Sequence, residues 1–542
     1  MNNHFKYNIF IMKWINRINN GKRLKLLFVF AIIIIVFNVS NAQKIDIVKS
    51  DFDYNYSSTT VHKIFGHDRD YFYVIKFTKN QYYIEKLDNN LNLVKTEPIK
   101  LHEGFRTFDL ETIVHFHNEI YMLSSHRRFN NISLYYTKIN KETLLADTTR
   151  VEIAKIGFIK GNWADFHFAL SRKETKLAVI CRTKLSLSKV QFNEYYVFGK
   201  DMELLWTKKD MIDFKGQGPR DNKYIVDEKG NISILSLLKR ASIISVFRDV
   251  KNVYTIYRYT HNGEFFQEYP ITLINRYIRG LKIIGTDSGD LVCAGLYSEI
   301  FRAGVRGTFF FRIDPDNGRI YDNTAQEFNE EMIGRLIAGK EPVIADEELI
   351  KYVMTDLVLR DNGKIILIAE QLFEQTYDTY NNLIVTCFDT TGQVYWTNVI
   401  PKNQDFNINL LKNEEIEPEE YRDYVIETGS IKMEIENYCS YALMAPVDKN
   451  SIVLFFNDHI KNLAENNKKT KNFNQPRRSY IQAVIIDEYG NINKKAVAKW
   501  KKKALYPVPM RYYDTLHDTI VIPAFKGRKY NYYKLTTELY KE

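Results

Sequence analysis

The sequence predicts an all-β protein, a β-propeller of seven or eight four-stranded blades with small helical insertions, and eight is the preferred number. The first observation is a strand–turn–strand unit that recurs along the chain. Its turns fall near Asp70, Asn118, Lys173, Gly230, Gly289, Gly363, Asn450 and Asp518. The second observation is composition: 37 Tyr and 34 Phe beside only 12 Pro favour strands, because aromatic side chains fit a pleated sheet.

A second polar turn follows each strand pair, as in RIDPDNGRIY and CFDTTGQVYW. Asn, Asp and Gly tolerate the positive φ that tight hairpin turns require, so each turn predicts a further pair of antiparallel strands. Four such strands every ~40 to 60 residues are typical of a propeller blade. Residues 43–542 are therefore expected to form one propeller domain.

The last unit has only three strands before the chain ends, so the N-terminal strand Lys44–Val48 is expected to close the ring by supplying the fourth. Insertions are expected at 324–350, 403–438 and 460–478. The first has apolar residues at helical spacing from Thr324 to Ile337, which predicts a short amphipathic helix.

The N-terminus predicts export. Six Lys and Arg and no acidic residue precede the apolar run Leu26–Phe37, which is too short for the roughly 20 residues that cross a bilayer. Small residues ending at Ala42 suit a signal peptidase, so residues 1–42 are expected to be a Sec signal peptide. The mature protein would be periplasmic, outer-surface or extracellular, with no transmembrane span. An uncleaved anchor stays open, as does a start at Met12 instead of Met1.

Removing the leader changes the meaning of the charge. It takes away six of the 76 basic residues, so that 70 Lys and Arg face 66 Asp and Glu. This balance gives no reason to expect nucleic acid as a partner.

Four cysteines are widely spaced and form no CxxC pair, which argues against zinc-ribbon and thioredoxin-like sites. They are Cys181, Cys293, Cys387 and Cys439. Three lie in apolar strand-like runs and are expected to be buried thiols. If one disulfide forms, Cys387 with Cys439 is the best pair.

Histidines recur at about one blade length in the first strands of the first three units. Imidazole and carboxylate suit zinc, copper or iron, so convergence of these strands would make a metal site in the propeller channel. The alternative is a set of histidines bonded to water and backbone, and no cofactor is then expected. The candidate ligands are His62, His115, His117, Asp165 and His167.

A basic run near the C-terminus is a candidate surface for an anionic glycan. The alternative is a solvated edge strand, because Lys on an outer strand blocks edge-to-edge pairing. The candidate binding residues are Lys499, Trp500, Lys501, Lys502, Lys503, Arg477 and Arg478.

The segment Phe388–Trp396, with an Asp and a Thr-Gly turn leading to a Trp, resembles the repeat of quinoprotein-type eight-bladed propellers. Lys200–Trp206 is a weaker copy. The resemblance implies an exported bacterial propeller in which the Trp stacks between blades. Vicinal cysteines of a quinone pocket are absent, so the resemblance is to non-catalytic members of that family.

Two function classes remain at this stage. The preferred one is a non-catalytic binding or scaffold protein of the cell envelope that recognises a protein or glycan through its loops, because no catalytic constellation emerges. The alternative is a secreted propeller enzyme, a hydrolase or lyase acting on polysaccharide or peptide. Convergent acidic, His or Tyr groups with perturbed pKa values would separate the two.

Overall fold

The structure, a computed structural model, describes residues 44–538 except 52, 56–60, 158–162, 185–189, 214–221, 241–250, 301–303, 330–347, 374–377, 407–437, 447–449, 464–469, 474–478, 500–504, 510–511 and 527–528. The chain divides into a large compact unit, 47–536, and a small one made of 1–46 and 537–542. No helix in the described ranges has the length and apolar character needed to cross a membrane. The predicted signal peptide lies outside the described residues.

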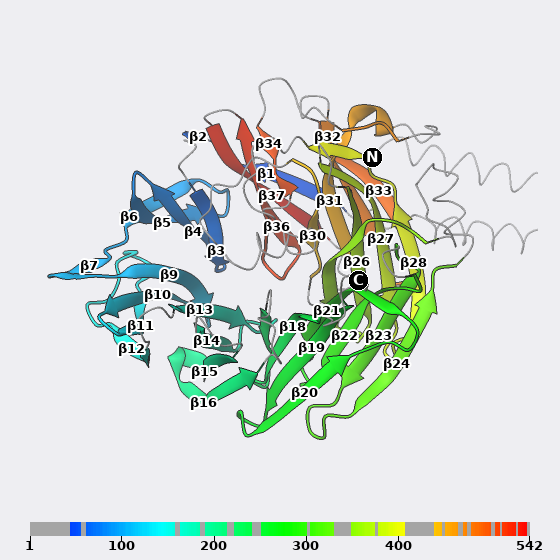
Figure 1. Cartoon of the computed structure of the whole chain (residues 1–542). Helices are drawn as coiled ribbons and strands as arrows, with labels where there is room; N and C mark the ends of the chain where they lie inside the picture. Colours follow the sequence, from blue (N-terminus) through cyan, green and yellow to red (C-terminus); the bar gives the residue numbers. More distant parts are fainter. Residues whose placement is uncertain are drawn as a thin grey trace, which may run out of the picture. The chain divides into compact units, whose positions relative to one another are not determined.

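The large unit is a nearly all-β propeller with eight antiparallel blades, as the sequence predicts (Figure 1). The first four sheets follow one another along the chain. Blade 1 has β3 (Val61–His67), β4 (Tyr71–Thr78), β5 (Gln81–Asp88) and β6 (Leu93–Pro98); blade 2 has β9 (Asp109–Phe116), β10 (Glu119–Arg128), β11 (Asn131–Ile139) and β12 (Val151–Gly157); blade 3 has β13 (Trp163–Leu170), β14 (Leu177–Lys184), β15 (Val190–Phe198) and β16 (Leu204–Asp213); blade 4 has β17 (Asn222–Val226), β18 (Ile232–Arg240), β19 (Lys251–Thr260) and β20 (Phe265–Ile271).

The other four sheets repeat this order. Blade 5 has β21 (Tyr277–Gly285), β22 (Leu291–Ser298), β23 (Gly307–Ile313) and β24 (Ile320–Glu327); blade 6 has β25 (Tyr352–Leu359), β26 (Ile365–Phe373), β27 (Asp378–Phe388) and β28 (Val394–Ile400), with β29 (Gln404–Phe406) paired to β27; blade 7 has β30 (Ala442–Met444), β31 (Ile452–His459), β32 (Ser479–Ile486) and β33 (Ile492–Lys499); blade 8 has β34 (Tyr506–Pro507), β35 (Tyr513–Asp514), β36 (Thr519–Lys526) and β37 (Lys529–Glu538).

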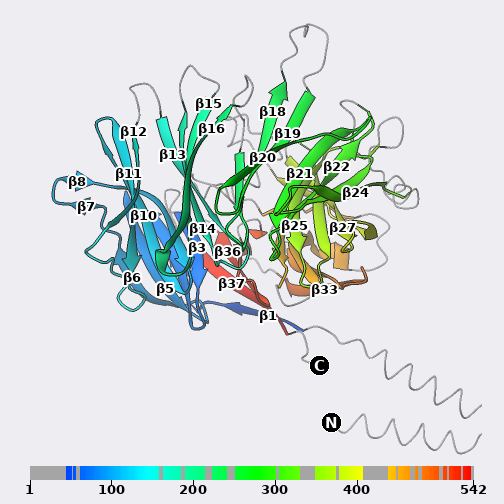
Figure 2. The ribbon, with the colours of Figure 1, turned by 90° about the horizontal axis from the view of Figure 1, so that it is seen from below.

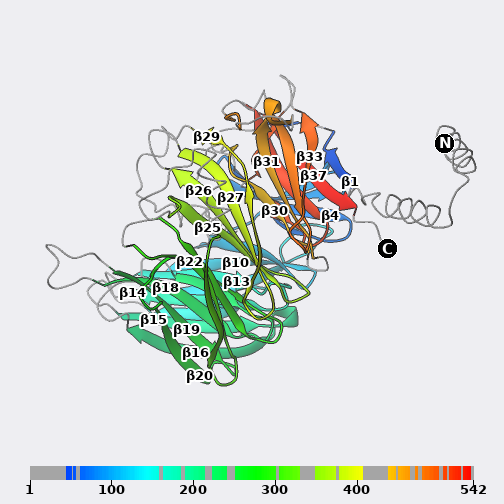
Figure 3. The same cartoon turned by 90° about the vertical axis from the view of Figure 1, so that its right-hand side faces the viewer.

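Blade 8 also includes strands from the N-terminal part of the chain. Its order is β1-β37-β36-β34, where β1 is Lys44–Lys49, and β2 (Tyr54–Asn55) pairs with β37 (Figure 2, Figure 3). Outside the blades lie a two-stranded ribbon, β7 (His102–Glu103) with β8 (Arg106–Thr107), and two short 3-10 turns, Lys200–Met202 and Ile460–Leu463.

Hydrophobic clusters join each blade to the next. Val179 of β14 packs with Leu134 of β11, and Val74 of β4 packs with Val521 of β36, which joins blade 8 to blade 1. Burying a side chain of this size stabilises the fold by roughly 1.5–3 kcal/mol. The first strands contact one another from blade to blade, as β3 does β9 and β13 does β17, and therefore form the inner ring.

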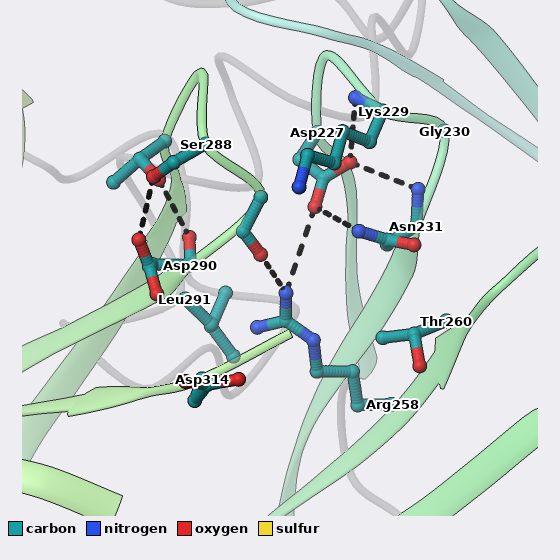
Figure 4. A network of polar contacts seen from close by, with 12 residues as sticks. Asp227, Lys229, Gly230, Asn231, Arg258, Thr260, Ser288, Asp290, Leu291 and Asp314 are labelled. Carbon is teal, nitrogen blue, oxygen red and sulfur yellow. Dashed lines mark hydrogen bonds and ion pairs between the residues drawn. The ribbon is translucent and has the colours of Figure 1, made fainter. Parts of the chain in front are cut away.

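Polar groups also connect the blades. The buried guanidinium of Arg258, in blade 4, donates to the carbonyl oxygen of Gly289 in the first turn of blade 5, and its Nη2 lies 3.6 Å from Oδ2 of Asp227 (Figure 4). Asp227 itself accepts hydrogen bonds from the side chain and backbone of Asn231 at 2.8 and 2.9 Å. Because the side chain of Arg258 is only 2% exposed, this network is a buried polar connection between blades 4 and 5.

The expected insertions are only partly described. The helix predicted from Thr324 is wrong at its start, because residues up to Glu327 belong to β24, where hydrogen bonding to β23 outweighs the local helical pattern. Phe328 and Asn329 are not helical either, and the predicted helix from residue 330 onward lies outside the described residues. In the second insertion the described part begins as strand β29, and in the third it begins as the 3-10 turn Ile460–Leu463.

Candidate functional site

Polar side chains from the inner strands of blades 2, 3 and 4 form the candidate site. Glu111 lies on β9, Asp165 and His167 lie on β13, and Tyr224 lies on β17. The two residues on β13 share one face because alternate residues of a strand do. Glu111, Asp165, His167 and Tyr224 are all partly accessible, so the cluster is not simply part of the apolar core.

Arg182 of β14 holds the Asp165 carboxylate with two hydrogen bonds, one of them 2.7 Å from Nε to Oδ1. The two residues are directly opposite in the β13–β14 register. Burial raises the pKa of the Asp165 carboxyl group, but the hydrogen bonds from Arg182 and the charges of Arg182 and His167 outweigh burial, so the pKa is lowered below its ordinary value. Asp165 is therefore ionised near neutral pH.

The imidazole of His167 lies between this carboxylate and an aromatic ring. Its Nε2 is 3.6 Å from Oδ2 of Asp165, and its ring centroid is 4.9 Å from that of Tyr224. Within the described part of the chain, this Nε2 is buried and has no hydrogen-bond partner. An imidazole nitrogen of this kind beside a carboxylate can accept a proton, because the negative charge stabilises the imidazolium that forms.

Glu111 has the opposite electrostatic environment to Asp165. Burial raises the pKa of its carboxyl group, a hydrogen bond from Ser125 lowers it, and the carboxylates of Asp109 and Asp165 raise it; the net pKa is raised. The Ser125 hydroxyl donates to Oε1 of Glu111 at 2.5 Å. The cluster thus holds one carboxyl group whose pKa is raised and one whose pKa is lowered, the pattern that divides acid and base roles.

Amide side chains surround the Tyr224 hydroxyl. Nδ2 of Asn222 donates to this hydroxyl at 3.3 Å, and Nε2 of Gln191 lies 3.4 Å from it. Gln191 also donates to Oδ1 of Asn193 at 2.6 Å, and the buried Nδ2 of Asn193 has no hydrogen-bond partner among the described residues. The wall beside His167 therefore carries both flat rings and amide groups.

The predicted metal ligands have different contact partners in the structure. His115 has His67 and Tyr73 as ring neighbours, with centroids 6.5 and 6.0 Å away, whereas His167 contacts Asp165 and Tyr224. His117 lies in the first turn of blade 2, with Nε2 3.0 Å from the Thr175 carbonyl oxygen. His62 pairs with Lys76 at the start of β3, and its side chain lies outside the described atoms.

His67, which the sequence analysis missed, forms a second cluster with His115. Its Nδ1 is 3.0 Å from the Tyr513 hydroxyl of blade 8. Burial lowers the pKa of His115 to about 4 and also lowers that of His67. Both rings are therefore neutral near pH 7. Over the ranges described here, no group of three or more His, Cys, Asp or Glu is arranged to hold a metal ion.

The basic candidate surface is described only in part. Lys499 is exposed at the end of β33, opposite Tyr480 of β32. The other candidates, Trp500, Lys501, Lys502, Lys503, Arg477 and Arg478, lie outside the described residues.

Of the candidate site, the sequence analysis named Asp165 and His167 but missed Glu111, Arg182 and Tyr224. Arg182 had a usable signal: once the turn after β13 is placed at Ser171–Lys176, hairpin register puts Asp165 opposite Arg182. No sequence signal indicated Glu111, because its interaction with Asp165 joins residues of two different blades.

Comparisons with known proteins give no family for this chain. No family model matches it, and no curated protein matches it. Among solved structures, an oligogalacturonate lyase in complex with manganese is similar over 92% of this chain and 98% of its own, at 8% identity and a TM-score of 0.38. Polysaccharide lyase Uly1 is similar over 80% and 93%, at 9% identity and a TM-score of 0.36. A prolyl endopeptidase is similar over 87% of this chain and 55% of its own, at 9% identity and a TM-score of 0.37. This chain therefore spans about half the length of that peptidase.

These solved structures correct the preferred function from the sequence. The three named above are enzymes, two lyases and a peptidase, and the non-catalytic scaffold is not retained. At such low identity they assign neither residues nor a substrate to this chain. The class of molecule defined here is therefore an eight-bladed β-propeller with a carboxylate–histidine cluster on its inner strands.

Proposed function

We propose that the protein is a propeller hydrolase that cleaves a glycosidic bond by general acid–base catalysis. The observation that supports this most directly is the pair of inner-strand carboxyl groups with opposite pKa shifts, Glu111 raised and Asp165 lowered. Two titratable groups whose environments separate their pKa values divide the roles of acid and base.

In the proposed reaction, Glu111 donates its proton to the leaving glycosidic oxygen. The imidazole of His167 takes a proton from the attacking water, and Asp165, fixed by Arg182 and 3.6 Å from Nε2 of this imidazole, stabilises the resulting imidazolium. Water attacks directly, without a covalent intermediate, so the configuration at the anomeric carbon is expected to invert.

The substrate class follows from the wall around the cluster. The rings of His167 and Tyr224 can cover the apolar face of a sugar, while the amide of Asn222 can bind a hydroxyl group. The charge of Arg182 is balanced by Asp165. A neutral polysaccharide therefore fits the cluster better than one rich in carboxylates.

The experiment measures new reducing ends when the protein is incubated with neutral polysaccharides and, in parallel, with uronate-rich ones. Glu111→Gln should lower kcat by at least about 100-fold, the usual contribution of a general acid. Glu152→Gln, on the exposed outer strand of the same blade, is the matched control and should keep wild-type activity. Wild-type activity in Glu111→Gln would overturn the proposal, and unsaturated products from uronates would indicate elimination in place of hydrolysis.

We also propose that this hydrolase is exported by Sec and acts in the periplasm, on the outer surface or outside the cell. The basic residues before Leu26, the apolar run to Phe37 and the small residues ending at Ala42 support this. Sequencing of the protein isolated from its cellular compartment should find an N-terminus at or near Gln43. Retention of Met1 or Met12 in a membrane fraction would contradict cleavage.

A further inference from the structure

Three residues of the candidate site lie on one hairpin, β13–β14, whose two strands are joined by one short turn. Asp165 and His167 lie on β13, Arg182 lies on β14, and residues Ser171–Lys176 connect the two strands. This connection, the latch turn, begins six residues after Asp165, a distance of roughly 20 Å in an extended strand.

Glu228, in the first turn of blade 4, binds the latch turn at three points. Its Oε2 accepts hydrogen bonds from the hydroxyls of Ser171, at 2.9 Å, and Thr175. Its Oε1 accepts a hydrogen bond from the backbone nitrogen of Lys173 at 2.6 Å. Hydrogen bonds to an ionised acceptor are about twice as strong as neutral ones, so this carboxylate is the main attachment of the latch turn.

Two cations of the latch turn reach further around the ring. Nη2 of Arg172 lies 3.1 Å from Oδ1 of Asp287 in blade 5, and Nζ of Lys173 lies 2.5 Å from Oδ2 of the same residue. Arg172 also lies 3.9 Å from Asp361 of blade 6. The Arg172 side chain is only 15% exposed, whereas Asp287 is 51% exposed, so this second attachment is weaker than that of Glu228.

On the other side, His117 of blade 2 contacts the carbonyl oxygen of Thr175 at 3.0 Å. The latch turn is thus held by blades 2, 4, 5 and 6, although its own blade is the third. A turn that served only to join two strands of one blade needs none of these contacts. Its attachments instead set the position of β13 and β14 relative to the neighbouring blades.

We propose that Glu228, supported by Arg172 and Asp287, is a positioning residue of the catalytic site. It holds the latch turn so that Asp165 and His167 face Glu111 across the boundary between blades 2 and 3. This inference rests on the proposed hydrolase activity for its kinetic consequence. Its structural consequence, a changed environment of His167, does not depend on any activity.

The experiment compares Glu228→Gln and Glu228→Ala with wild type and with the control Glu264→Gln, an exposed residue of the same blade. Displacement of a catalytic group by about 1 Å can cost on the order of 100-fold in rate. Glu228→Ala should therefore lower kcat by about 10- to 100-fold with little change in KM, and Glu228→Gln, which keeps one acceptor oxygen, by less.

A second readout follows the His167 imidazole by NMR through a pH titration, with His167→Gln used to assign its signal. Glu228→Ala should shift the titration of His167, while Glu264→Gln should leave it unchanged. If the titration and kcat of Glu228→Ala both equal those of wild type in a folded protein, the proposal is overturned. If wild type is inactive on every glycan, the hydrolase fails, whereas the His167 titration still decides the positioning role.

Discussion

The indole nitrogen of Trp206, on the outer strand of blade 3, donates a hydrogen bond of 3.0 Å to the carbonyl oxygen of Gly230 in blade 4. Its ring lies against Gly263, in a second turn of blade 4. Trp396 connects blades 6 and 7 in a similar way. Its indole nitrogen donates a hydrogen bond of 3.1 Å to the carbonyl oxygen of Glu488, and its ring packs on Gly490. The sequence analysis singled out these two tryptophans, and each joins its blade to the next.

Replacing Gly263 by alanine tests this packing. Its φ is +79°, and a Cβ there would lie 2.8 Å from Cζ3 of Trp206, so Gly263→Ala combines backbone strain with a steric clash. Gly104→Ala is the matched control, because Gly104 has a φ of +57° but nothing within 4 Å of its Cβ position. We expect Gly263→Ala to destabilise the protein by about 1–3 kcal/mol more than Gly104→Ala in urea unfolding. Equal effects would mean that the indole can move away freely.

We expect the buried carboxyl group of Asp514 to make the free energy of unfolding depend on pH. Burial raises the pKa of its carboxyl group to about 7, despite hydrogen bonds from backbone nitrogens such as that of Leu516. The folded state therefore binds this proton more tightly than the unfolded state, and the contribution to stability, full below about pH 4, is lost as pH rises through about 7. Asp514→Asn should equal wild type at pH 4 and be more stable at pH 8, by up to about 4 kcal/mol at 1.4 kcal/mol per pKa unit.

Thermal melting of both proteins at the two pH values checks this expectation. Asp361→Asn, which changes a carboxyl group that is 41% exposed, is the control and should show no such difference between pH 4 and pH 8. A wild-type protein that matches Asp514→Asn at pH 8 would show that Asp514 ionises without cost.

We expect loss of the Ser125 hydroxyl to shift the pH dependence of activity. Its hydroxyl donates to Glu111 and thereby lowers the pKa of that carboxyl group. A general acid must be protonated, so activity is lost as pH rises through the Glu111 pKa. Ser125→Ala should raise this pKa further and move the alkaline limb of the kcat profile upward by about one pH unit. Ser133→Ala, on the next strand, should leave the limb in place; an unmoved limb in Ser125→Ala would remove Glu111 from the role of acid.

Ring closure by the N-terminal strand stays a prediction that deletion can test. The segment after β1 contacts two other blade elements: Oγ of Ser50 donates to Asn92 at 3.1 Å, and Nδ2 of Asn531 lies 3.3 Å from the Ser50 carbonyl oxygen. Deleting Gln43–Asp51 removes these contacts and the neighbour of β37, so the melting temperature should fall sharply or the protein should aggregate. Removing the last three residues, 540–542, serves as the control. Unchanged melting after the N-terminal deletion would contradict closure.

The thiols give a direct chemical check on the strand assignments. Cys181, Cys293, Cys387 and Cys439 are all buried and none of the four forms a disulfide, which confirms the expectation of buried thiols. Burial raises the pKa values of Cys181, Cys293 and Cys387. A thiol reagent should therefore react slowly with the native protein and titrate four groups after denaturation without reductant. A count of two would indicate a disulfide and a different arrangement of the strands around Cys387 and Cys439.

The sequence by itself determined the eight repeated units and the shared face of Asp165 and His167, because hairpin turns and the two-residue strand period are local properties. The pairing of Asp165 with Arg182 is equally local to one hairpin, but it was recognised only in the structure. These features depend only on neighbouring strands of one blade.

Only the tertiary structure decided which residues meet between blades. His115 contacts His67, which follows the irregular register between Ile64 and Gly66 of β3, and the spacing of the histidines in the sequence did not predict this contact. Glu111 acquires its raised pKa from burial and from carboxylates that include Asp165 of the next blade. Such relationships arise when separate sheets pack around one axis, and the period of a single strand carries no information about them.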